Sequence, residues 1–269
     1  MYREAGGTTF KEISKGALKK FKIPVPPIEE QRRIVDILKR ADGIRRLRKQ
    51  AQDTARQLIP ALFIDLFGDP ATNPKGWPAG TIGDVIESAD YGSSTKASTN
   101  GAGLPFIRMG NVDYAGNFDL SDLKHVELTA AEVEKYGLRA GDILFNRTNS
   151  KELVGKTGLW DGRCEAVAAS YFIRVRVKRS SLNPFYLWAF MNTAHMKRVL
   201  FETARGAIGQ SNINAKELRG FCITLPPLRL QDEFEKRCSD VSGLEVQQAV
   251  ATANAEATFQ SLLYQVFLG

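Results

Sequence analysis

The sequence predicts an α+β protein in which one mixed α/β domain is combined with two long helices that pack on each other. The first observation is a repeat: residues 21–31 (FKIPVPPIEEQ) return as residues 221–231 (FCITLPPLRLQ), at an offset of 200 residues and without a gap. The second is a heptad-like spacing of apolar residues after each copy, which is typical of coiled-coil packing. The third is the body between the copies, residues 76–226, which mixes short strand-like and helix-like patterns. A repeat at a fixed spacing indicates that one supersecondary unit occurs twice.

Each repeat unit is expected to contain a short strand, a proline pair and a helix. Apolar residues alternate at a period of two in residues 21–25 and 221–225, which predicts the strands. The proline pair then removes backbone donors and stops the strand, and Pro27 and Pro227 lie near the first helical turn, where proline is tolerated. The expected divisions are a terminal segment at 1–26, a first helix in 27–69, a linker at 70–75, the mixed domain at 76–226 and a second helix in 227–269.

The first helix is expected to run without a break from about residue 28 to 66, because apolar or small residues recur every three or four positions up to Leu66. The motif FGDP at 67–70 supplies the glycine and proline that end a helix. Residues 29–56 carry nine basic and five acidic side chains, whereas residues 229–256 carry three basic and six acidic ones. The two helices thus have apolar stripes of matched length and opposite net charge, which predicts that they pair.

Within the mixed domain, strands are expected at 141–145 and 169–177 and helices at 129–135 and 184–202. In the second strand, Phe172, Arg174 and Arg176 share one face. The other face carries Tyr171, Ile173, Val175 and Val177.

Composition limits the classes of function. The chain has 269 residues, 43% of them hydrophobic, which is enough for a substantial core. No apolar run is long enough for a membrane-spanning helix, and no secretory signal is recognisable. The three cysteines, Cys164, Cys222 and Cys238, form no C-x-x-C pair, which favours a reducing, cytoplasmic location. The net charge of +7 is consistent with a polyanionic partner.

No catalytic constellation is recognisable. His125 and His195 lie in no metal-ligand spacing. Residues 155–157 (GKT) resemble the end of a phosphate-binding loop, but Ser150 stands where that loop requires glycine. The sequence therefore predicts a protein that is not an enzyme and holds no cofactor or metal.

Four polar loops, at residues 91–96, 106–111, 145–151 and 206–213, point instead to nucleic acid. Arginine, lysine, asparagine and glutamine read base edges, while serine, threonine and lysine commonly hold phosphates. Residues 144–179 add eight basic side chains against three acidic ones. The residues expected to contact DNA are Tyr91, Ser93, Ser94, Thr95, Lys96, Arg108, Asn111, Asn146, Arg147, Thr148, Asn149, Ser150, Lys151, Lys156, Gln210, Ser211 and Asn212.

Five segments together resemble the specificity (S) subunits of type I restriction-modification systems. They are PPIEEQRRI, PPLRLQDEF, LFGDPATNPKGW, GDILFNRTNSKELVGKTG and GAIGQSNINAKELRGF. The resemblance implies target-recognition domains, each followed by a long conserved helix, with the two helices paired as an antiparallel coiled coil that sets the distance between two half-sites. It also implies that this chain is a non-catalytic DNA-recognition subunit. Methylation (M) and restriction (R) subunits would carry the catalysis, together with S-adenosylmethionine, ATP and Mg²⁺.

The sequence departs from the full pattern of that family, because it holds one whole target-recognition domain, residues 76–226. Residues 1–26 match only the last segment of such a domain, so the chain resembles a half-size or truncated subunit. Two copies could associate and present identical domains, or a separate chain could supply the missing body. Two alternatives stay open: a structural or interaction protein that works through its coiled coil, and a fragment of a fused restriction-methylation enzyme.

Overall fold

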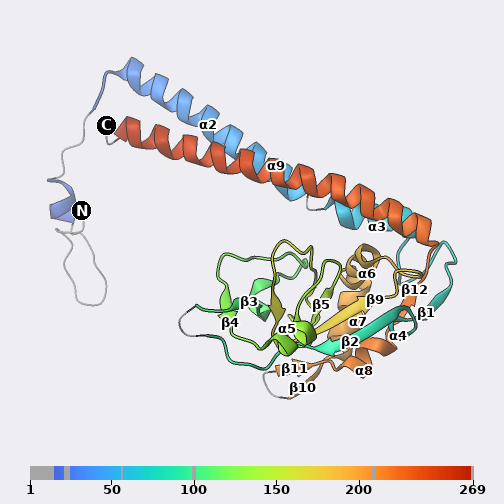
Figure 1. Ribbon diagram of the computed structural model, residues 1–269. Helices are drawn as coiled ribbons and strands as arrows, with labels where there is room; N and C mark the ends of the chain where they lie inside the picture. The colour runs from blue at the N-terminus through green and yellow to red at the C-terminus, as the bar shows by residue number, and fades with distance from the viewer. Residues whose placement is uncertain (1–14, 21–24, 56, 99–100, 208–209, 268–269) are drawn as a thin grey trace. The chain divides into compact units, whose positions relative to one another are not determined.

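The computed structural model of the chain describes residues 15–20, 25–55, 57–98, 101–207 and 210–267 (Figure 1). The chain forms two compact units. One comprises residues 53–246, and the other joins residues 1–52 to residues 247–269. The first unit therefore contains all of the predicted mixed domain, 76–226, and parts of both helical segments. The strand predicted at 21–25 and most of the terminal segment 1–26 lie outside the described residues.

The larger unit is built on a four-stranded antiparallel sheet in the order β2-β9-β5-β7. These strands are β2 (Ile86–Tyr91), β9 (Phe172–Val177), β5 (Ile143–Asn146) and β7 (Thr157–Leu159). In this sheet Tyr91 is opposite Ile173, and Asn146 is opposite Phe172. Both flanking strands run antiparallel to β9, so β2 and β5 end on either side of the point where β9 begins.

The two faces of β9 contribute to two different hydrophobic cores. Ile173, Val175 and Val177 belong to the larger core, which also includes residues of α3, α6 and α7. Phe172 belongs to a second core with Leu144 and Trp160. The alternation predicted for this strand is therefore confirmed, because successive side chains of a strand point to opposite faces.

Smaller sheets surround the main one. One has the order β4-β3-β8 and consists of β3 (Leu104–Ile107), β4 (Lys124–Val126) and β8 (Val167–Ala168). A second has the order β10-β11-β6 and consists of β6 (Thr148–Asn149), β10 (Arg205–Ala207) and β11 (Gln210–Asn212). In the third, β1 (Ala79–Thr81) pairs with β12 (Cys222–Thr224). The short helices are α1 (Lys15–Leu18), α4 (Ile82–Val85), α5 (Ala130–Tyr136) and α8 (Ala215–Gly220), with a 3-10 turn, η2, at Met109–Asn111. Strand β12 confirms the strand predicted in the second repeat, and α5 confirms the helix expected at 129–135.

The helix expected at 184–202 is divided into α6 (Pro184–Met191) and α7 (Ala194–Thr203). Thr193 caps the second of these, because its side chain accepts a hydrogen bond from the amide of Met196. A threonine in the extended conformation with a free hydroxyl is a preferred N-cap, so a new helix starts there.

The first long helix is also divided, into α2 (Ile28–Ala55) and α3 (Leu58–Phe67), and the prediction of one helix from 28 to 66 was wrong. Pro60 supplies the reason. Proline has no amide hydrogen, and its ring collides with the carbonyl four residues earlier, so a helix cannot pass through residues 56–60 undisturbed. Pro60 lies instead in the first turn of α3, where proline is tolerated. Its counterpart in the second repeat is Gln260, and α9 (Leu228–Phe267) continues through that position.

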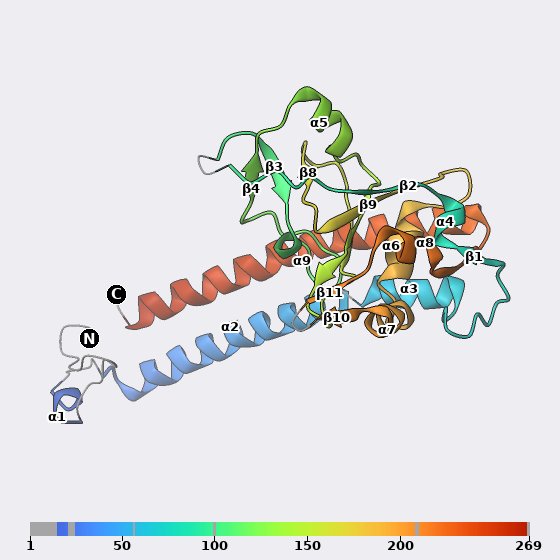
Figure 2. The same ribbon diagram turned by 90° about the horizontal axis from the view of Figure 1, so that it is seen from below.

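In the smaller unit, α2 and the C-terminal half of α9 lie side by side and antiparallel (Figures 1 and 2). The guanidinium of Arg45 is 4.7 Å from the ring centroid of Phe259 and 3.5 Å from Glu256, and Arg48 donates to Gln248 at 3.3 Å. These contacts match the opposite charge predicted for the two helices. Several apolar side chains of these segments remain exposed, namely Ile28, Val35, Ile44, Leu47, Val250 and Tyr264. Knobs-into-holes packing of the two helices therefore stays a prediction.

The repeat contains the same hydrogen bond in both copies. The side-chain amide of Gln31 donates to the carbonyl of Pro26 at 2.8 Å, and that of Gln231 donates to the carbonyl of Pro226 at 2.8 Å. Each glutamine thus satisfies a carbonyl that its proline pair would otherwise leave without a donor. In the second copy the glutamine also accepts a hydrogen bond from the amide of Asn183 at 2.8 Å and is fully buried.

Candidate nucleic-acid interface

Three segments that are far apart in the sequence meet where β2 and β5 end. Tyr91 is the last residue of β2, Arg147 follows β5, and Asn212 ends β11. The register of the main sheet brings the first two together across the start of β9. Strand β6 then pairs with β11, which places Thr148 opposite Asn212. We call Tyr91, Arg147, Thr148 and Asn212 the strand-end cluster.

Arg147 is held in place by its backbone and by the ring of Tyr91. Its amide donates to the carbonyl of Tyr171 at 2.9 Å, and its carbonyl accepts from the amide of Ile213 at 2.9 Å. The guanidinium carbon lies 4.8 Å from the centroid of the Tyr91 ring. The Tyr91 hydroxyl in turn accepts a hydrogen bond from the amide of Ala215 at 3.3 Å. Cation–π contact and backbone anchoring together restrict where this arginine points.

Exposed polar residues extend the cluster on both sides. The hydroxyl of Thr148 donates to Asn212 at 3.4 Å, and the ammonium of Lys151 lies 4.4 Å from the ring centroid of Phe201 on α7. Asn149 and Ser150 are half-buried, while Ser94, Thr95 and Lys96, which follow Tyr91, are exposed. Gln210 lies in β11 next to this surface, and the structure does not describe its side chain.

Five of the residues expected to contact DNA are buried instead, namely Ser93, Asn111, Asn146, Lys156 and Ser211. Their polar atoms mainly hold the surrounding loops: Asn111, for example, accepts from the amide of Arg108 and donates to the carbonyls of Asp119 and Asp122. The sequence identified these residues as polar but could not show that their hydrogen bonds are made within the protein. We therefore correct the candidate surface by removing them.

Arg108 lies apart from the strand-end cluster, at the end of β3 in the neighbouring sheet. Its guanidinium is 3.3 Å from the carboxylate of Asp122 and 3.2 Å from the carbonyl of the same residue. An arginine that is already paired with a carboxylate is less available to a ligand, because the ligand must compete with that pair.

Tyr171 is an exposed residue that the sequence analysis did not select. It precedes β9, is 43% exposed, and its carbonyl receives the amide of Arg147. The sequence placed it on the apolar face of the strand by alternation. A tyrosine at the boundary between a polar loop and an apolar strand was the available signal, since its hydroxyl favours the water-exposed side.

Two lysines anchor the segment 109–118 to the domain. Lys156 donates to the carbonyls of Met109 and Val112 at 2.6 and 2.5 Å. The ammonium of half-buried Lys197 lies 4.6 Å from the ring centroid of Tyr114 and donates to the carbonyl of Gly155 at 3.1 Å. Burial lowers the pKa of both ammonium groups, and for Lys197 the pKa falls from 10.5 to about 8. The carboxylate of Asp113 acts in the opposite direction on both.

We expect Lys197→Met to reduce the pH dependence of stability on the alkaline side. Between pH 8 and 10.5 the folded state loses the Lys197 proton while the unfolded state keeps it, so the wild-type free energy of unfolding should rise across this window relative to the variant. Urea unfolding of both proteins at pH 7.5, 9 and 10 measures the difference. A difference that stays constant over these three values would contradict the assignment.

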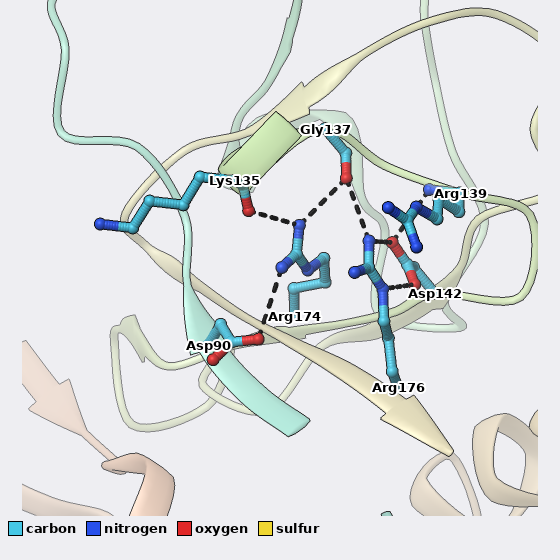
Figure 3. Close-up of polar contacts among 7 residues, drawn as sticks. All are labelled: Asp90, Lys135, Gly137, Arg139, Asp142, Arg174 and Arg176. Atoms are coloured by element: carbon cyan, nitrogen blue, oxygen red, sulfur yellow. Dashed lines mark hydrogen bonds and ion pairs between the residues drawn. The ribbon is translucent and has the colours of Figure 1, made fainter. Parts of the chain in front are cut away.

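Two arginines of β9, Arg174 and Arg176, form an arginine cluster with the polar groups around them (Figure 3). Arg174 donates to the carbonyls of Lys135 and Gly137, both at 3.0 Å, and lies 3.4 Å from Asp90, the neighbour of Tyr91. Arg176 donates to both carboxylate oxygens of Asp142 at 2.8 and 3.1 Å.

The two arginines differ in their surroundings. Burial lowers the pKa of Arg174, while the hydrogen bond to Asp142 raises that of Arg176. The cluster joins the C-terminal end of α5 to strands β2 and β9, and thereby supports the strand on which Tyr91 lies.

The strand-end cluster is suited to binding a ligand rather than to catalysis. The cluster offers an aromatic face, a guanidinium, hydroxyls and amides. These groups can stack, donate and accept, but the cluster contains no nucleophile paired with a general base. Among the described residues, no group of three metal-ligating side chains is gathered at one place. In the same part of the chain, no helix combines the length and apolar character that crossing a bilayer requires.

Comparison with known proteins places this geometry in a family. The family model for the type I restriction modification DNA specificity domain matches residues 1–55 and 74–246. The chain belongs to this family. The match includes every element of the strand-end cluster and both copies of the proline-pair motif.

Members of the specificity-domain family are similar to the chain over nearly its whole length. It is 24% identical to the EcoKI specificity subunit of a type I restriction enzyme from Escherichia coli K12, over 98% of this chain and 61% of that protein. The fold is similar to that of a chain from a type I R-M system solved for its complex assembly, with a TM-score of 0.61, 24% identity, and coverage of 98% of this chain and 65% of that one.

A type I restriction-modification S subunit from M. genitalium also has a similar fold, with a TM-score of 0.58, 13% identity, and coverage of 99% of this chain and 68% of that one. The chain thus spans about three fifths of the length of the EcoKI subunit.

Proposed function

We propose that the chain is a non-catalytic, sequence-specific DNA-recognition subunit of a type I restriction-modification complex. It would direct methylation and restriction subunits to a bipartite target. The observation that carries the proposal is the strand-end cluster, in which Tyr91, Arg147 and Asn212 come together from three separate segments on a domain of the specificity family. Stacking and bidentate donors at one surface are what base recognition in a groove requires.

We further propose that a second chain, either another copy or a different specificity chain, completes the first repeat. In the second copy, Phe234 and Cys238 are fully buried and Gln231 bonds the main chain of Asn183. At the matching positions of the first copy, Ile34 and Leu38 are only half-buried, and the neighbouring Val35 is 46% exposed. A helix face that is covered in one copy and uncovered in the other supports docking of a further domain body.

Methylome mapping tests the function. The chain is expressed with its modification subunit in a host that lacks other methyltransferases, and modified positions are read from the genome. We expect one bipartite motif, and an inverted repeat if two identical copies associate, because a two-fold axis relates their domains. Methylation that shows no sequence preference would overturn the proposal. Light scattering of the purified chain, alone and with its modification subunit, separates the homodimer from a pairing with another chain.

The alternative, a structural or interaction protein that works through its helices, is not favoured by the family match. The cytoplasmic location stays a prediction from the sequence.

A further inference from the structure

We infer that Arg147, aligned by the ring of Tyr91, reads a guanine through the major groove, and that Tyr91 is the positioning residue for this contact. The inference rests on the proposed function, because it names the base that the strand-end cluster would select. It assigns a recognition role to one arginine and an orienting role to one tyrosine.

The guanidinium of Arg147 is available to a ligand. Several other arginines of the domain are engaged by carboxylates, namely Arg108 with Asp122, Arg163 with Asp161, and Arg176 with Asp142. Within the described ranges, no carboxylate pairs with Arg147, and no side-chain hydrogen bond of Arg147 is formed. A ligand can therefore meet its fork of donors without displacing an ion pair.

The backbone and the surroundings of Arg147 fix the direction in which its side chain points. The backbone of Arg147 is bonded on both sides, to Tyr171 and to Ile213. Its Nε is buried and without a partner, whereas the terminal Nη1 and Nη2 are not among the buried unpartnered atoms. The stem of the side chain is thus enclosed and its two terminal nitrogens face outward beside the Tyr91 ring, which is itself 45% exposed.

The donors of the guanidinium match the acceptors of guanine. A guanidinium stacked on an aromatic face presents a planar edge with two donors, and ordering it in advance reduces the entropy lost on binding. Guanine places two acceptors, O6 and N7, side by side in the major groove, and an arginine bonded to both is the commonest specific contact. Adenine, cytosine and thymine do not offer two adjacent acceptors there.

Selection from a random duplex library tests the inference, with the full chain in complex with its modification subunit. Wild type should enrich a motif with at least one invariant guanine. Arg147→Lys and Arg147→Ala should lose the preference at that position and keep the rest of the motif. Tyr91→Ala should weaken the same preference, and Tyr91→Phe should restore it relative to Tyr91→Ala. Arg179→Lys, an exposed arginine beyond the opposite end of β9, is the matched control and should leave the motif unchanged.

Base analogues in the enriched duplex identify the atoms that are read. Replacing that guanine with 7-deazaguanine removes N7 and should weaken wild-type binding by roughly tenfold, as expected for loss of a base-edge contact. Inosine keeps O6 and N7 but lacks the minor-groove amino group, so binding should be unchanged. The Arg147→Ala complex should not distinguish the three duplexes.

The outcomes separate the two proposals. If wild type enriches no motif at any salt concentration, the proposed function fails and the inference fails with it. If wild type enriches a motif but Arg147→Ala weakens all sequences equally, Arg147 contacts phosphate and only the inference is overturned. Sensitivity to inosine but not to 7-deazaguanine would also overturn it, because the contact would then lie in the minor groove.

Discussion

Replacing Arg176 with methionine is expected to lower the free energy of unfolding by about 3–5 kcal/mol, the range found when one partner of a buried ion pair is removed. The side chain of Asp142 is only 3% exposed and accepts two hydrogen bonds from Arg176. Methionine fills a similar volume but leaves this carboxylate buried without its cation. The amide of Arg139 would remain its donor, which is insufficient for a buried charge.

Chemical denaturation of wild type, Arg176→Met and the double variant Arg176→Met/Asp142→Asn measures this effect. The double variant should be more stable than Arg176→Met, because the amide removes the stranded charge. Arg33→Met is the control: Arg33 contacts both oxygens of Glu30 at 2.8 and 2.7 Å, but that pair is exposed to solvent, so its loss should lower the free energy of unfolding far less than Arg176→Met does. Equal losses for Arg33→Met and Arg176→Met would show that burial is not the decisive factor.

Gln231→Ala should destabilise the chain by about 2–4 kcal/mol, because it leaves two buried main-chain groups without partners and creates a small cavity. The groups are the carbonyl of Pro226 and the amide of Asn183. The repeat supplies a matched variant in the same chain. Gln31→Ala removes the same bond to a proline carbonyl, that of Pro26, at a half-buried position, and should cost about 1 kcal/mol or less.

Urea unfolding of the two variants compares the copies of the repeat directly. If a second chain covers the first copy, Gln31→Ala should also weaken the assembly measured by light scattering, while leaving the unassembled chain close to wild type. A loss of stability in Gln31→Ala as large as that in Gln231→Ala would contradict the difference in burial between the two sites.

The local elements were largely predictable because the signals that set them lie within a few residues. Strands β5, β9 and β12 and helix α5 follow from alternation, from the proline pair and from the capping residue Thr129. The apolar spacing does not show the two helix breaks, because it continues across Pro60 and Thr193 although single residues there start new helices. Pro60 was visible in the sequence, and its effect on the backbone overrides side-chain periodicity.

The candidate site was predictable only as a set of polar loops. Lys156 and Asn146 have the residue types of DNA contacts, yet both are buried and make hydrogen bonds inside the domain. No pattern in the chain distinguishes them from Arg147, because solvent exposure depends on which strands lie side by side. Tyr171 shows the converse case, since alternation placed it on an apolar face and the end of the sheet leaves it exposed.

What the sequence by itself determined is the duplicated unit: two proline pairs, each followed by a glutamine, and two helical segments of opposite charge. The structure adds that each glutamine bonds the carbonyl of the proline five residues earlier, and this bond recurs because it depends only on neighbours in the chain. Only the tertiary structure decided which glutamine is buried and which arginine is free. Asn183 reaches Gln231 from 48 residues away, and Asp122 and Asp142 pair with Arg108 and Arg176 across strands and loops. Among the described residues, no carboxylate pairs with Arg147, because the same packing brings it to the ring of Tyr91.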